Sequence, residues 1–194
     1  MILSMKKADE TDVAIVVDAL MRGGIVVLRT DTIYGIVTRA DNSDNCDRVF
    51  ALKQRDADKS CIILVADESQ MWDKVSCEAY QTAGRILDDT YPTSVIVPVG
   101  PRTPVWLVHH DQHQDDVAFR IPSTTPWLMH VLEQTGPLIA PSANLQSQSP
   151  AQHIQQAYEY FGAAVDLYVD GGTVESAEPS HLYRVRDGVA ERLR

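Results

Sequence analysis

The sequence predicts an α/β fold built on a mixed β-sheet. Short runs rich in Val, Ile and Leu, which are typical of buried strands, alternate along the chain with segments that have the apolar spacing of a helix. Glycines and prolines separate many of these segments. The length of 194 residues suits one domain, or at most two small ones, and we expect residues 1–194 to form a single domain.

The helical segments carry apolar residues three and four positions apart and have polar or proline residues at their starts. Thr11 opens the first segment, and Gly23 stops it. Ser43 is a candidate N-cap of the second, and Pro126 suits the first turn of the fourth. The expected helices cover residues 11–21, 43–53, 78–87, 126–134 and 151–161.

The expected strands are short and apolar, and most of them end in polar or turn residues. A turn at Asp187-Gly188 indicates a hairpin near the end of the sequence. The strands cover residues 25–28, 61–65, 94–99, 117–121, 138–140, 167–169, 182–185 and 189–193.

The charge of the chain argues against tight general binding of nucleic acid. Asp and Glu outnumber Lys and Arg by 27 to 17, which gives a formal net charge of −10. A protein that binds nucleic acid without sequence preference needs a basic face to neutralise phosphates. We therefore do not expect tight general binding to RNA or DNA.

Neither a membrane span nor a secretion signal is expected. No run approaches the roughly 18 apolar residues of a transmembrane helix. Lys6 and Lys7 are not followed by the apolar stretch of a signal peptide, so we expect a cytoplasmic protein without a membrane partner.

We expect no metal site in the protein itself. The three cysteines have no CxxC spacing, which argues against both a disulfide framework and a structural zinc site. The segment from His109 to Asp116 is rich in His and Asp, but its spacing matches no defined metal site. We interpret this segment as a solvated loop.

Polar groups gather directly after the first expected strand, in the run Thr30-Asp31-Thr32-Ile33-Tyr34-Gly35. Ligand sites of α/β proteins lie at strand ends of this kind. The alternative is that the Thr and Asp side chains cap the next element and that Tyr34 belongs to the core. This run taken singly leaves both readings open.

Three further groups of residues suit the binding of anions. Lys53, Arg55 and Lys59 form a basic cluster that could hold phosphate or carboxylate, or could complement a helix dipole. Arg120 lies in an apolar strand, so it needs either an internal carboxylate or a substrate carboxylate. Ser142 and Asn144 follow a short strand, where they either cap a turn or bind phosphate oxygens.

Common nucleotide and hydrolase motifs are absent from the sequence. There is no Walker loop, no G-x-G-x-x-G fingerprint and no G-x-S-x-G nucleophile elbow.

Taken together, five short motifs resemble the Sua5/YciO/YrdC family of threonylcarbamoyl-AMP synthases. They occur in the order expected for that family and span nearly the full length, so we identify the chain as similar to its short, single-domain form. The motifs are Thr30–Gly35 (TDTIYG), Lys53–Arg55 (KQR), Val117–Pro122 (VAFRIP), Ser142–Asn144 (SAN) and Pro179-Ser180.

The resemblance implies a twisted, YrdC-like sheet with a deep, positively charged cavity. It also implies that L-threonine, bicarbonate and ATP are converted to threonylcarbamoyl-adenylate and pyrophosphate. That product feeds t6A modification of tRNA through further proteins of the pathway. Mg²⁺ would be held by the ATP phosphates and water rather than by a protein cage.

The resemblance also assigns roles to residues. On the amino-acid side, Thr30 and Thr32 would lie near the threonine, Tyr34 would wall the pocket, Arg120 would pair with the carboxylate, and Ser180 would contact the substrate. Lys53 and Arg55 would be the catalytic residues. The ATP-binding residues would be Lys53, Arg55, Lys59, Ser142, Asn144 and Arg192.

The chain departs from the family pattern at several positions. Arg29 and Pro141 replace residues usual in the family, and the segments 91–94 and 145–148 lack the expected glycines. Two alternatives therefore accompany the synthase hypothesis: an RNA-binding or ribosome-associated protein, and a YciO-like paralogue with a different substrate. The retained KQR and SAN motifs favour the synthase.

Overall fold

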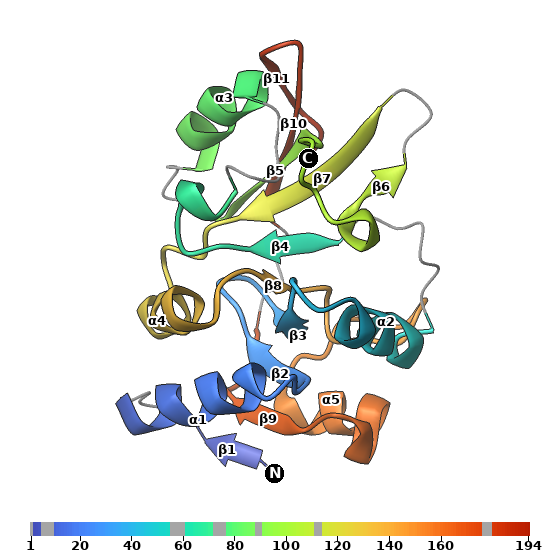
Figure 1. The fold of residues 1–194 in the computed structure, drawn as a ribbon. Coiled ribbons are helices and arrows are strands. Elements are labelled where there is room, and N and C mark those ends of the chain that lie inside the picture. Colours follow the sequence, from blue (N-terminus) through green and yellow to red (C-terminus); the bar gives the residue numbers. More distant parts are fainter. Residues whose placement is uncertain are drawn as a thin grey trace.

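The computed structural model describes residues 2–4, 10–54, 61–71, 77–87, 91–110, 114–175 and 180–194. Within these ranges the α/β class is confirmed, because helices pack on a large mixed sheet (Figure 1). The helices are α1 (Glu10–Met21), α2 (Ser43–Leu52), α3 (Cys77–Leu87), α4 (Pro126–Thr135) and α5 (Ile154–Phe161). Short 3₁₀ turns lie at Glu68–Gln70, Val105–Leu107 and Gly162–Ala164.

Eleven strands are found in the described part of the chain. They are β1 (Ile2–Ser4), β2 (Val26–Arg29), β3 (Tyr34–Arg39), β4 (Ile62–Leu64), β5 (Thr93–Pro98), β6 (His109–His110), β7 (Asp115–Arg120), β8 (Leu138–Ile139), β9 (Leu167–Asp170), β10 (His181–Arg186) and β11 (Val189–Arg192).

The strand order is β1-β9-β2-β3-β8-β4-β7-β5-β10-β11, and β6 pairs with β7. Parallel and antiparallel pairs are mixed: β4 runs parallel to β7, whereas β3 and β4 both run antiparallel to the short strand β8. This order places β2, β8 and β7 in the central part of the sheet. Polar motifs of the sequence lie at the ends of these three strands.

Successive side chains of a strand point to opposite faces of the sheet, and each face carries an apolar layer. From β2, Val26 and Leu28 belong to an apolar cluster with the buried residues of α1 and α4, whereas Val27 belongs to the cluster on the opposite side, which includes residues of α2, α3 and α5. In Figure 1, α1 and α4 lie on the left of the sheet, and α2 and α5 lie on the right. Helices therefore cover the sheet from both sides.

The observed boundaries refine several expectations. The N-cap of α2 is Asn42 rather than Ser43, because the Asn42 side chain accepts a hydrogen bond from the backbone N–H of Asn45 at 3.0 Å. Helix α5 begins at Ile154 instead of residue 151, because His153 caps it through Gln156 N–H at 3.2 Å.

Three strands were missed at the sequence level. Strands β1 and β6 are too short to give a periodic pattern, and β3 is hidden because it begins inside the polar run at Tyr34. The interpretation of residues 109–116 as a solvated loop was wrong at both ends. His109 pairs with Asp116 and His110 with Asp115 across β6 and β7.

Among the described residues, none of the helices combines the length and the apolar character that crossing a bilayer requires.

Candidate active site

The polar run after β2 is the turn of a β-hairpin. The backbone N–H of Thr30 donates to the carbonyl of Ile33 at 2.9 Å, which closes the turn between β2 and β3. The Thr30 hydroxyl donates to the same carbonyl at 2.8 Å and accepts from the N–H of Thr32 at 3.2 Å. Thr30 therefore fixes the shape of the turn, while Thr32 stays only partly buried at its tip.

Tyr34 ties this hairpin to the loop after β9. Its hydroxyl donates to the carbonyl of Gly172 at 2.7 Å and accepts from the N–H of Gly171 at 3.0 Å. Burial raises the pKa of the phenol, which keeps it protonated as a donor. The ring is fully buried, so Tyr34 is a structural element of the wall, and its hydroxyl is occupied by protein groups.

Arg120 and Asp31 form an ion pair inside the protein. Arg120 is the last residue of β7, and its Nη2 lies 3.2 Å from Oδ1 of Asp31 in the hairpin turn. The two side chains are only 6% and 1% exposed. Arg120 thus has the internal carboxylate that was one of its two expected partners.

Burial has the largest effect on the pKa values of both members of this pair. Burial raises the pKa of Asp31, and the nearby guanidinium of Arg120 offsets part of that rise. The pKa of Arg120 is lowered by burial, with Asp31 opposing the change and Arg194 adding to it. The pKa of Asp31 is thus higher in the folded protein than in the unfolded chain. The folded protein therefore loses stability as the pH rises through the folded-state pKa and the carboxyl ionises.

Lys53 holds the loop after β8. This residue is 3% exposed, and its ammonium donates to the carbonyl of Ser142, to the carbonyl of Asn144 at 2.7 Å and to Oδ1 of Asn144 at 3.2 Å. The Ser142 hydroxyl also donates to Oδ1 of Asn144, at 2.6 Å. In this structure Lys53 binds protein oxygens, so its expected role at ATP phosphates stays a prediction.

The same loop is joined to the start of β3. The N–H of Ala143 donates to the carbonyl of Tyr34 at 2.8 Å, and the N–H of Ile36 donates to the carbonyl of Pro141 at 3.0 Å. A bridge also pairs Gly35 with Ser142. These bonds place the Ser142–Asn144 loop beside the Thr30–Gly35 hairpin.

Ser180 lies immediately before β10, the first strand of the C-terminal hairpin. Its hydroxyl lies 3.0 Å from that of Ser94, which pairs with Arg120 between β5 and β7. Nε of Arg194 donates to the carbonyl of Ser180 at 3.1 Å. Ser180 and Arg194 therefore lie together on the Arg120 side of the site.

These elements enclose a cavity of about 230 Å³. We call this space the central cavity. Its lining residues come from the hairpin, from β4, β7 and the loop after β8, and from the C-terminal segment. They are Thr30, Thr32, Ile33, Tyr34, Gly35, Cys61, Ile62, Arg120, Ala140, Pro141, Ser142, Ser180 and Arg194.

The central cavity unites six of the expected site residues, namely Thr30, Thr32, Tyr34, Arg120, Ser142 and Ser180. Lys53 and Asn144 do not line it and instead support the loop that carries Ser142. Arg192 lies exposed on β11. Arg55, Lys59 and Pro179 fall outside the described residues, and the depth implied by the family resemblance is not shown.

Two residues of the site were missed in the sequence. Arg194 lines the central cavity, whereas the expectation fell on Arg192, two positions earlier. Asp31 was interpreted only as part of a polar run, although an Arg in an apolar strand calls for a carboxylate partner. The need for that partner was visible in the sequence, but its identity was not.

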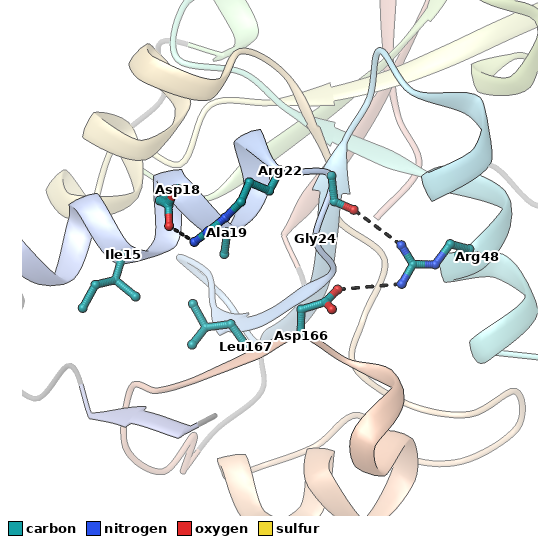
Figure 2. A pocket seen from close by; sticks show the side chains of 9 residues that line it. Ile15, Asp18, Ala19, Arg22, Gly24, Arg48, Asp166 and Leu167 are labelled. Carbon is teal, nitrogen blue, oxygen red and sulfur yellow. Dashed lines mark hydrogen bonds and ion pairs between the residues drawn. The ribbon is translucent and has the colours of Figure 1, made fainter.

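A second hollow, of about 360 Å³, lies near the start of β2 (Figure 2). Its charged side chains are already paired, Arg22 with Asp18 and Arg48 with Asp166 at 3.8 Å. All four are at least half exposed, so water weakens these charges. Asp166 also accepts the N–H of Ile25 at 2.7 Å, which gives this region a structural role at the start of β2.

The contacts of Lys53 predict a loss of stability on substitution. Lys53→Met should lower the free energy of unfolding by about 2 kcal/mol, because oxygens that accept from a charged donor lose their partner. Urea denaturation measures the change. Arg22→Met, which removes an exposed cation, should cost less than about 0.5 kcal/mol. Equal small losses in both variants would show that Lys53 does not hold the loop.

Comparison with known proteins places the chain in a family. The Sua5/YciO/YrdC family model, described as telomere recombination, matches residues 18–194. A threonylcarbamoyl-AMP synthase of Pseudoalteromonas translucida is 26% identical over 186 residues, which cover 93% of this chain and 97% of that protein. Another, from Pseudomonas fluorescens, is 30% identical over 174 residues, 86% of this chain and 88% of that protein.

Solved structures of low sequence identity share the fold. P. abyssi Sua5, solved in complex with L-threonine, has a TM-score of 0.85 at 23% identity, and the match covers 100% of this chain and 57% of that chain. E. coli YciO has a TM-score of 0.81 at 17% identity, and the match covers 100% of this chain and 93% of that chain. Since the family match covers most of its length, the chain belongs to the Sua5/YciO/YrdC family.

Proposed function

We propose that residues 1–194 form one domain with the activity of a threonylcarbamoyl-AMP synthase, which makes L-threonylcarbamoyl-adenylate from L-threonine, bicarbonate and ATP. The observation that carries the proposal is the central cavity, whose lining combines Thr30 and Thr32 of the hairpin with Arg120 and Arg194. The curated relatives named above, which are threonylcarbamoyl-AMP synthases, support it.

The composition of the cavity suits an amino acid next to a phosphate. Arg120 and Arg194 give it positive charge in a protein whose net charge is −10. Guanidinium groups bind carboxylates and phosphates through paired N–H donors. The threonine carboxylate would bind Arg120, and its other groups would contact Thr32 and Ser180.

The volume of the cavity limits what it can hold. About 230 Å³ is below the roughly 300 to 1,000 Å³ typical of pockets for larger ligands. Threonine and the reacting part of the triphosphate would fill it, and the remainder of ATP would extend beyond it. Arg55 and Lys59 are the proposed partners of the outer phosphates.

The reaction needs two bond-forming steps. The threonine amine attacks the carbon of bicarbonate, and loss of water leaves a carbamate. A carbamate oxygen then attacks the α-phosphorus of ATP, and the bond to the β-phosphate breaks to release pyrophosphate. Positioning of the reactants and neutralisation of their negative charges by the protein would supply most of the rate.

Magnesium would enter with the nucleotide as MgATP, held by phosphate oxygens and water. In the part of the chain that the structure describes, His, Cys, Asp and Glu side chains do not form any group of three or more suited to a metal ion. The product would be passed to other proteins for t6A modification of tRNA.

Pyrophosphate release tests the proposal directly. Protein incubated with MgATP and bicarbonate should release pyrophosphate when L-threonine is added, because the carbamate forms only on an amine held in the cavity. L-Serine and a reaction without amino acid serve as controls. Equal release in all three reactions would refute the synthase, and preference for another amine would point to a paralogue with a different substrate.

A matched pair of variants tests which arginine of the C-terminal segment serves the nucleotide. Arg194→Gln should raise KM for ATP about tenfold, because a charged donor at the central cavity is lost. Arg192→Gln should change KM by less than about twofold, because Arg192 does not line the central cavity. Steady-state kinetics at saturating threonine distinguish the two, and the reverse order would restore the assignment to Arg192.

A further inference from the structure

Asp31 lies on the far side of Arg120 from the central cavity. Arg120 lines that cavity, whereas Asp31 lines a separate hollow with Arg29, Thr125 and Gly171. Thr30 borders both spaces. The ion pair of Asp31 and Arg120 is therefore part of the partition between them.

The ion pair with Asp31 leaves N–H groups of the Arg120 guanidinium available to a ligand. Asp31 contacts one terminal nitrogen of the guanidinium, at 3.2 Å. Nε of Arg120 is buried, and among the residues that the structure describes none accepts a hydrogen bond from it. A guanidinium carries further N–H groups in the same plane, so the side of Arg120 that lines the cavity can still bind a carboxylate.

The position of Asp31 is set by its backbone. Asp31 follows Thr30 in a turn that the Thr30 hydroxyl closes through bonds to the backbone of Thr32 and Ile33. A carboxylate on so tight a turn is a fixed counter-charge. Arg194, which lines the same cavity, repels Arg120 and opposes the attraction of Asp31.

We propose that Asp31 is a positioning residue that holds the guanidinium of Arg120 with its free N–H groups toward the central cavity, where they bind the carboxylate of the amino-acid substrate. This inference rests on the proposed function for the identity of that substrate. It assigns Asp31 no contact with substrate.

The positioning role predicts a ligand-specific effect. Asp31→Asn should raise the dissociation constant of L-threonine about tenfold, since Arg120 loses the charge that orients it. L-Threoninamide, which has no carboxylate, should bind the variant and the wild type with similar affinity. Isothermal titration calorimetry of the whole protein measures both ligands.

Two further variants separate positioning from folding. Asp115→Asn removes an exposed carboxylate at the start of β7 and should leave both affinities unchanged. Asp31→Glu restores the charge and should recover much of the threonine affinity. Equal weakening of threonine and threoninamide, with a lowered melting temperature, would make Asp31 merely structural and would overturn the inference.

Failure of the inference can be told apart from failure of the proposed function. Unchanged threonine affinity in Asp31→Asn overturns the inference even if the wild type releases pyrophosphate. Wild-type protein that binds threonine more tightly than threoninamide, loses that preference in Asp31→Asn and yet releases no pyrophosphate would uphold the inference and refute the synthase. A wild type without any preference for the carboxylate overturns the inference.

Discussion

The burial of the positive charge of Arg120 is the constraint on which the rest of the site depends. An unpaired guanidinium in the interior would be strongly destabilising, so the fold must supply a counter-charge or a ligand. The hairpin turn supplies Asp31 at 3.2 Å. The turn is itself fixed by Thr30, which explains why a polar run follows an apolar strand. The polar run of the sequence is thus both a structural device and a wall of the cavity.

The side chains that support the site differ from the cations that line the cavity. Lys53 is committed to the loop of Ser142 and Asn144, and Tyr34 is committed to the backbone after β9. Arg120 and Arg194 line the central cavity. Charges that are already in place reduce the reorganisation needed when a charged substrate binds, and this is the main way such a site can accelerate adenylate formation.

Sequence reasoning predicted the class of the fold and six of the residues that line the cavity, because strand ends carry local signals and the family resemblance added Ser180. It could not predict which carbonyl groups an ammonium would meet, so the contacts of Lys53 with the loop of Ser142 and Asn144 were not foreseen. Arg194 and Asp31 were missed for a similar reason. Their roles depend on the register of distant strands, and a single sequence does not reveal that register.

A structure of the protein with bound L-threonine would test the central claim most directly. The account predicts that the threonine carboxylate lies within hydrogen-bonding distance of the Arg120 guanidinium in the central cavity, while Asp31 keeps its contact with the other side of that group. Threonine bound elsewhere, or bound to Arg120 only after the contact with Asp31 has broken, would contradict it.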